Sequence, residues 1–260
     1  MKKLINRFLS YLNIQVVKKS SFNKLLVSSR NSELFELLKV ININYKIDFL
    51  NWLNQSKSEL GQDLFVLSQL KFKKNGFFVE FGATNGLDSS NTYLMETKFE
   101  WQGILAEPAK IFHQELKKNR NSNIETNCVW RTTGETLDFK EDKHPSLSGV
   151  SSFLNDSFSS RYLAKFQSSY SVQTISLEDL LKKFNAPNII DYLSIDTEGS
   201  EFDILNSFNF EKYKFRIITC EHNYKPNREK IYSLLTKNSY KRVFADVSKW
   251  DDFYIHSDQS

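Results

Sequence analysis

The chain has 260 residues, of which 40% are hydrophobic and 25% are charged, so we expect one domain of enzyme size with a core of its own. Its formal net charge of +4 arises from the segment before the first acidic residue, Glu33, which carries Lys2, Lys3, Arg7, Lys18, Lys19, Lys24 and Arg30. The rest of the chain is close to neutral, which gives little support to a nucleic-acid partner.

The first twenty residues predict a basic amphipathic helix, since apolar side chains recur at helical spacing: Leu4, Ile5, Phe8, Leu9 and Leu12. Polar residues interrupt this run before it could form a signal peptide or span a bilayer, so we expect no export by that route. Packing on the domain itself or on a dimer partner is favoured over peripheral contact with the inner face of a membrane.

The next segment continues with helical periodicity, so residues 1–70 are expected to form a helical extension and residues 71–260 the main domain. From there, strand-like runs such as "GFFVEFG", "QGILAEP", "NIIDYLSID" and "FRIITCEH" alternate with helical ones. This alternation predicts an α/β fold with a parallel sheet covered on both faces. The last two strands are close in sequence, which predicts an antiparallel hairpin at a sheet edge.

Two local signals refine this outline. Ser176 followed by Asp179 predicts a capped helix start, and Ser200 could cap the next helix. The run from residue 141 to 173 is rich in serine and too long for a mere connection, so it is either a lid over a substrate or a loose excursion.

The stretch "VEFGATNGLDSSNTYLME", residues 79–96, reads as a buried strand that turns into a helix. Ligands of open α/β sheets bind at such a turn. Gly82 and Gly86 let the backbone approach a ligand, the helix start offers N–H groups to an anion, and Glu80 would attract a cation. Because the turn lacks the middle glycine of a dinucleotide site, it favours a smaller, partly cationic ligand over NAD.

S-adenosylmethionine fits this description, since it carries an amino acid group, a sulfonium and a ribose. Glu107 ends the next strand, about twenty residues after Gly86, where an acid usually accepts the ribose hydroxyls. The alternative is that Gly82 and Gly86 only form a tight turn and that Glu107 is a solvated acid.

Four stretches resemble the FkbM family of methyltransferases: "FVEFGATNGLDSSNTYLMETKFEWQGILAEP", "TISLEDLL", "IDYLSIDTEGSEFDILNSF" and "IITCEHN". The resemblance implies a Rossmann-like, seven-stranded class I methyltransferase sheet with an antiparallel last strand, and S-adenosyl-L-methionine as the cofactor. It also implies which residues contact that cofactor: Glu80, Gly82, Gly86, Asn91 and Glu107, with Asn127 near the adenine. Trp130 and Arg131 stand where the family often has smaller residues.

Three polar residues end two neighbouring strands of the implied sheet: Asp196 ends one, and Glu221 and His222 end the other. His222 has the intrinsic pKa of a general base near neutral pH, and Asp196 is the second catalytic candidate. Asp196 and Glu221 could instead hold Mg or Mn. Glu198 and Glu201 are further metal candidates, but a stabilising role at a helix start is favoured for both.

The sequence therefore predicts an O-methyltransferase acting on a hydroxyl of a small or oligomeric metabolite, a sugar of a surface glycan above all. Aromatic residues in the serine-rich run could stack on a sugar ring: Tyr162, Phe166 and Tyr170. The alternatives are a catalytically silent member that binds a glycan or membrane surface, and an NAD-dependent oxidoreductase. Cys128 and Cys220 lie in apolar runs without the spacing of a metal site, which favours a reducing cytoplasm.

Overall fold

The structure is a computed structural model that describes residues 29–141, 148–154 and 168–259. The amphipathic helix predicted within the first twenty residues lies outside these ranges, as do Tyr162 and Phe166. Within the described ranges, no helix has both the length and the apolar character needed to cross a bilayer.

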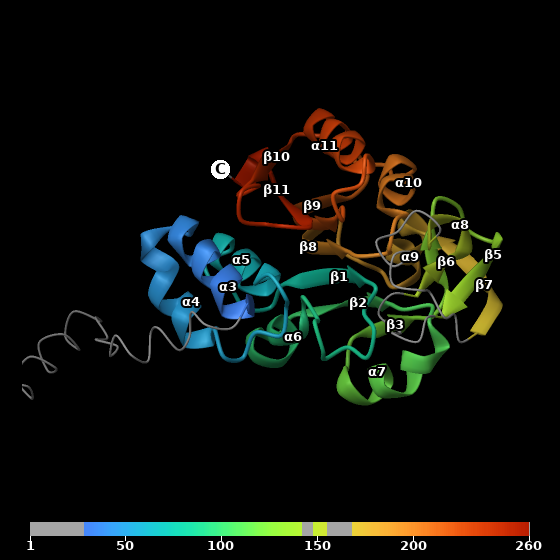
Figure 1. Cartoon of the computed structure of the whole chain (residues 1–260), viewed down its shortest axis with the longest axis horizontal. Helices are drawn as coiled ribbons and strands as arrows, with labels where there is room; N and C mark the ends of the chain where they lie inside the picture. The colour runs from blue at the N-terminus through green and yellow to red at the C-terminus, as the bar shows by residue number, and fades with distance from the viewer. Residues whose placement is uncertain (1–28, 142–147, 155–167, 260) are drawn as a thin grey trace, which may run out of the picture.

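A seven-stranded sheet forms the centre of the molecule, in the order β10-β11-β9-β8-β1-β2-β3 (Figure 1). Its strands are β1 (Phe77–Phe81), β2 (Gln102–Ala106), β3 (Asn123–Glu125), β8 (Ile189–Ile195), β9 (Lys214–Glu221), β10 (Tyr240–Val243) and β11 (Asp251–His256). β1, β2, β3, β8 and β9 pair in parallel, whereas β11 pairs antiparallel with both β9 and β10. This confirms the class I methyltransferase sheet with a reversed last strand. The predicted antiparallel hairpin of β10 and β11 is present. Its second strand, β11, pairs with β9 inside the sheet, and its first strand, β10, forms the edge.

Helices cover both faces of this sheet because neighbouring residues of each buried strand point to opposite sides. Phe78 belongs to one core cluster, which includes side chains of α3 (Ser29–Val40), α4 (Lys46–Trp52), α5 (Gln62–Gln69), α6 (Tyr93–Phe99) and α7 (His113–Asn119). Val79 belongs to the other, which includes side chains of α9 (Leu177–Lys183), α10 (Glu201–Asn206) and α11 (Asn227–Lys237). Strands buried on both faces explain the nearly continuous apolar runs of the sequence.

The described part of the helical extension belongs to the same core as the sheet. Phe65 of α5 is fully buried and stacks on Phe253 of β11, with 4.5 Å between the ring centroids. Leu37 and Phe49 of the preceding helices are buried in the same cluster as Phe78. These helices therefore do not form a separate hydrophobic unit.

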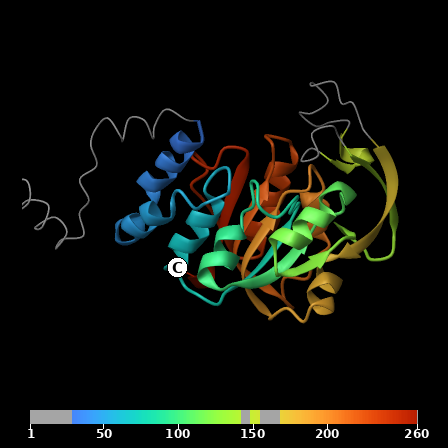
Figure 2. The ribbon, with the colours of Figure 1, turned by 90° about the horizontal axis from the view of Figure 1, so that it is seen from below.

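A second, smaller sheet has the order β4-β7-β5-β6 and lies at the opposite end of the molecule from α3 and α4 (Figure 2). Its strands are β4 (Cys128–Trp130), β5 (Thr136–Glu141), β6 (Gly149–Val150) and β7 (Ser168–Ser176), and the short helix α8 (Ser151–Leu154) follows β6. The sequence run "NIETNCVW" reads as one strand, but it divides between β3 and β4. Glu125 Oε1 accepts hydrogen bonds from the backbone N–H groups of Thr126 and Asn127, which turns the chain between the two sheets.

The two predicted helix caps have different outcomes. Ser176 Oγ accepts a hydrogen bond from Asp179 N at 3.1 Å, as the capping pattern predicts. Ser200 makes no such bond to its helix, and its hydroxyl donates to Thr197 Oγ1 instead.

The shared core predicts that the extension and the sheet unfold together. Phe65→Ala should lower the free energy of unfolding by about 3–5 kcal/mol, since it removes a fully buried aromatic ring. Ile43→Ala is the control, because Ile43 is 74% exposed and its loss should cost less than about 0.5 kcal/mol. Urea unfolding followed by fluorescence measures both. Two separate transitions would contradict a common core.

Candidate active site

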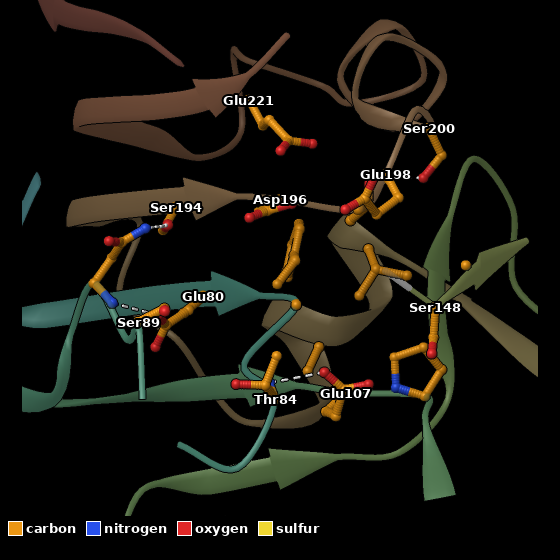
Figure 3. A pocket seen from close by; sticks show the side chains of 18 of the residues that line it. Glu80, Thr84, Ser89, Glu107, Ser148, Ser194, Asp196, Glu198, Ser200 and Glu221 are labelled. Atoms are coloured by element: carbon orange, nitrogen blue, oxygen red, sulfur yellow. Dashed lines mark hydrogen bonds between the residues drawn. The ribbon is translucent and has the colours of Figure 1, made fainter. Parts of the chain in front are cut away.

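A cavity of about 250 Å³ opens at the carboxyl ends of β1, β2, β8 and β9 (Figure 3). The small sheet borders it through Val129 and Val150, and the helical extension borders it through Glu59 and Gln62. The cavity therefore lies where an open α/β sheet binds its ligands, and all three parts of the fold contribute to it.

Acidic side chains dominate the lining of this cavity. Eight carboxylate residues line it: Glu59, Glu80, Asp88, Glu107, Asp196, Glu198, Glu221 and Asp251. No Lys, Arg or His among the described residues lines the same cavity. Such a site favours cationic ligands and repels a pyrophosphate.

The turn after β1 depends on Gly82, which has a φ of +72°. A Cβ at this position would lie 2.1 Å from the carbonyl oxygen of Asp196, so the turn packs directly on the end of β8. Gly86, with a φ of +76°, would place a Cβ 2.6 Å from side-chain atoms of Leu116 and Arg120. Gly82 lines the cavity, whereas Gly86 packs against α7 and does not.

Glu80 holds the loop between β1 and α6 in place. Its carboxylate accepts hydrogen bonds from the backbone N–H of Asn91 at 2.7 Å and from the hydroxyls of Thr92 at 2.5 Å and Ser90 at 3.1 Å. Arg120 Nη1 lies 3.6 Å from the same carboxylate. Glu80 borders the cavity, and its hydrogen bonds fix the loop that lines the cavity next to it.

Arg120 is a site residue that the sequence did not reveal. Its buried guanidinium donates to Gly86 O, Ser90 Oγ and Thr92 Oγ1, and its Nε donates to Glu96 at 2.8 Å. The residue follows a helix that ends in lysines, where a basic side chain is ordinary. No local pattern distinguishes it, because its partners lie about thirty residues earlier in the chain.

Asn91 connects two strands and leaves one acceptor open. Its Nδ2 donates to Ser194 Oγ of β8 at 2.9 Å, and its backbone N–H donates to Glu80 of β1. Its Oδ1 is buried and has no hydrogen-bond partner. A buried acceptor without a partner is costly, so this oxygen is suited to a donor on a ligand.

Glu107 lies at the end of β2, where the sequence predicted it. Its two oxygens accept hydrogen bonds from Thr84 N at 2.8 Å and Ala109 N at 2.7 Å, and each oxygen has a second lone pair. Burial raises the pKa of Glu107 to about 7 although these hydrogen bonds oppose the shift. Asn127, predicted near the adenine, does not line the cavity, whereas its neighbour Cys128 does.

Three carboxylates meet where β8 and β9 end. Asp196, Glu198 and Glu221 each offer an oxygen within 4.8 Å of the others, and the side chain of Asp196 is open to the cavity. Although Asp196 borders the cavity, protein atoms surround its carboxylate; this desolvation, followed by the charge of Glu201, raises the pKa of Asp196 to about 7. Burial and Asp196 raise the pKa of Glu198 to about 8 and that of Glu221 well above its usual range.

His222 lies away from this cluster. Glu221 faces the cavity, and the next side chain along an extended backbone points to the other side. The Nδ1 of His222 accepts a hydrogen bond from Tyr224 N at 2.9 Å, while its Nε2 lies 3.7 Å from Asp252. Burial lowers the pKa of His222, which favours the neutral imidazole. This position gives the ring no contact with the cavity that Asp196 and Glu221 line.

Glu201 has the stabilising role that the sequence favoured. Its Oε1 accepts hydrogen bonds from the backbone N–H groups of Thr197 at 3.1 Å and Gly199 at 2.9 Å. These bonds fix the loop that carries Glu198 into the cavity lining.

The buried acids of the cavity predict that stability falls as the pH rises from 7 to 8. Burial raises the pKa of Asp251 to about 8, from 3.8 in an unfolded chain. The folded protein therefore binds more protons than the unfolded chain in this window, so the free energy of unfolding decreases with pH. Thermal unfolding in EDTA should give a lower midpoint at the higher pH.

Asp251→Asn should reduce this difference, whereas Asp48→Asn on the exposed surface should leave it unchanged. A midpoint that rises between pH 7 and 8 would contradict the assignment.

Comparison with known proteins identifies a family whose sequence pattern this chain matches. The methyltransferase FkbM domain matches residues 80–253. No curated protein sequence matches the chain. Among solved structures, precorrin-6y C5,15-methyltransferase from Geobacter metallireducens is 11% identical, with a TM-score of 0.36 over 69% of this chain and 71% of that one. A chain of a fibrillarin/Nop5p complex is also 11% identical, with a TM-score of 0.36 over 73% and 79% of the two chains.

The FkbM match begins at Glu80, ends at Phe253 and includes both the loop after β1 and the carboxylates of β8 and β9. The chain therefore belongs to the FkbM family of methyltransferases, which use S-adenosylmethionine as the methyl donor.

Proposed function

We propose that this protein is an O-methyltransferase whose acceptor is a hydroxyl group of a small or oligomeric metabolite, with a glycan sugar as the acceptor class. The observation that carries the proposal is a cavity lined by eight carboxylates and by no basic side chain of the described chain. A cofactor with an ammonium and a sulfonium suits this lining, and hydroxyl groups can donate to its oxygens.

The residues of the cavity fit the cofactor in two places. Glu107 retains lone pairs for the two ribose hydroxyls, and the unpartnered Oδ1 of Asn91 can accept from an amino group. When bound, S-adenosylmethionine supplies a methyl group activated by its sulfonium. The chain's own contribution is to hold the acceptor in line with that methyl group.

A hydroxyl acceptor is a weak nucleophile until its proton is removed. Asp196 is open to the cavity and has a pKa near 7, which suits a general base near neutral pH. Glu221 lies beside it and can share the proton that Asp196 receives. We therefore assign the role of base to Asp196.

Mg²⁺ or Mn²⁺ at Asp196 and Glu221 is the second way to activate the hydroxyl. Ligands of an octahedral ion at about 2.1 Å lie up to about 4.2 Å apart, so a small inward movement would bring the three oxygens to one ion. A cation there would make the acceptor hydroxyl easier to deprotonate.

A sugar suits the remainder of the lining. Trp250 lines the cavity beside Asp251, and an aromatic residue next to carboxylate acceptors is suited to a sugar. Tyr170, which the sequence favoured for stacking, is already engaged: Lys110 Nζ lies 4.2 Å from its ring centroid, and its hydroxyl donates to Glu141. Trp250 is therefore the stacking candidate.

Two alternatives fit less well. An NAD-dependent oxidoreductase needs partners for a pyrophosphate, and the described lining offers acids in their place. A catalytically silent member does not explain Asp196, whose carboxylate is open to the cavity and has a pKa near 7. Groups with such shifted pKa values are typical of catalytic sites.

Calorimetric titration with S-adenosylhomocysteine tests the cofactor and the metal together. We expect micromolar binding in EDTA, and a change in affinity or heat on adding Mg²⁺ or Mn²⁺ if Asp196 and Glu221 hold an ion. Binding of NADH in place of S-adenosylhomocysteine would support the oxidoreductase, and no binding of either would favour the silent member. Methyl transfer to a panel of mono- and oligosaccharides then tests the acceptor class.

Substitution at β8 separates the two candidate bases. Asp196→Asn should lower kcat by at least about a hundredfold with little change in the affinity for S-adenosylhomocysteine. His222→Gln should alter stability more than turnover, because its ring lies outside the cavity. The reverse pattern would return the role of base to His222.

A further inference from the structure

Glu59 lies outside the residues matched by the family, yet it reaches the cavity. It precedes Glu80, where the family match begins, by 21 positions and is carried by the loop between α4 and α5. Its side chain is exposed, and the exposed surface contributes to the cavity lining. The helical extension thus supplies a carboxylate that the family motifs do not contain.

Buried hydrogen bonds hold the loop that carries Glu59 in one conformation. Asp63 is fully buried and accepts hydrogen bonds from Ser56 Oγ at 2.8 Å and Ser58 Oγ at 2.6 Å, so it ties the residues before Glu59 to the start of α5. Gln62 accepts from Leu60 N and donates to Asp251 Oδ2 at 2.9 Å, which ties the loop to β11. A carboxylate held on such a loop keeps its position without help from a ligand.

Glu59 also touches the loop that follows β1. Ser89 Oγ donates to Glu59 Oε1 at 2.8 Å, and Ser89 has a φ of +58°, an uncommon conformation for serine. Two residues later, Asn91 presents the buried Oδ1 that lacks a partner. A carboxylate and an amide oxygen therefore come from adjacent parts of the cavity wall.

The position of Glu107 indicates which end of the cofactor would reach this wall. Glu107, the acceptor for the ribose hydroxyls, ends β2, and the cavity continues across β1 to β8. Asn91 bonds Glu80 of β1 and Ser194 of β8. Figure 3 shows Ser89, Glu80 and Ser194 together on the side of the cavity away from Glu107. With the ribose at β2, the amino acid end of the cofactor extends toward Asn91 and Ser89.

We propose that Glu59 binds the α-ammonium group of S-adenosylmethionine, with Asn91 Oδ1 as the second acceptor. An ammonium has three donors and a positive charge, and a carboxylate beside an amide oxygen complements both. This inference rests on the use of S-adenosylmethionine and adds to it an anchor supplied by the helical extension.

Two ligands that differ in the amino acid end test the inference. S-adenosylhomocysteine carries the α-ammonium group, and 5′-methylthioadenosine lacks the whole amino acid end while keeping the ribose and adenine. For the full chain, Glu59→Gln should weaken binding of S-adenosylhomocysteine by at least about tenfold, because a charge-assisted contact is lost. Binding of 5′-methylthioadenosine should change by less than about twofold. Isothermal titration calorimetry measures both.

Two matched variants identify the cause of any loss of S-adenosylhomocysteine affinity in Glu59→Gln. Ser89→Ala removes the hydroxyl that binds Glu59 but leaves the carboxylate, and it should weaken S-adenosylhomocysteine binding much less than Glu59→Gln. Glu211→Gln removes a carboxylate from the exposed surface and should change neither affinity. Thermal midpoints of all three variants should remain at the wild-type value.

Equal weakening of both ligands by Glu59→Gln, or an equal loss in Ser89→Ala, would overturn the inference and leave Glu59 with a loop-positioning role. Unchanged binding of S-adenosylhomocysteine in Glu59→Gln would also overturn it while leaving the proposed function intact. A wild-type chain that binds neither ligand would remove the cofactor itself, and with it both the proposed function and this inference.

Discussion

The buried contact between Arg120 and Glu80 is the constraint on which the site depends. Both side chains are almost fully enclosed, and a buried ion pair is tolerated only when its remaining donors and acceptors are satisfied. Here the loop between β1 and α6 satisfies them, since Ser90 and Thr92 bond both partners. The loop cannot change shape without leaving a buried charge unpaired, so its conformation is fixed before any ligand arrives.

That contact also determines the electrostatic character of the cavity. Arg120 neutralises Glu80 from behind the loop and is itself no part of the lining. Where β8 and β9 end, Asp196 and Glu221 have no such cation within the lining. Their pKa values rise because the charge of a neighbouring acid, Glu201 for Asp196 and Asp196 for Glu221, adds to burial. Because Arg120 stabilises the loop from outside the cavity, the lining itself contains acids and no basic side chain of the described residues. Such a cavity is suited to cationic ligands and to accepting a proton near neutral pH.

The sequence could predict those features that depend on local pattern. The alternation of strands and helices, the turn at Gly82 and the acid at Glu107 all follow from residues near one another in the chain, and the structure has each of them. His222 shows the limit of such reasoning: a strand end can be predicted to within a residue or two, but a shift of one residue reverses the side to which a side chain points. Arg120 and Glu59 could not be found, because distant segments give them their partners.

The small sheet, and the packing of the predicted helical extension against the main sheet, escaped prediction for related reasons. The chain leaves the main sheet at Thr126 through a turn made by the side chain of Glu125, and no glycine or proline marks the place. The extension reads as a separate preface because its helices carry no motif, yet Phe65 shares the core of the sheet and Gln62 binds Asp251 of β11. Because this segment is held both in the core and at the cavity wall, its packing helps to fix the positions of the side chains that line the cavity. The part of the chain that precedes the family match therefore lines the cavity through Glu59 and Gln62, together with the strand ends that the family match includes.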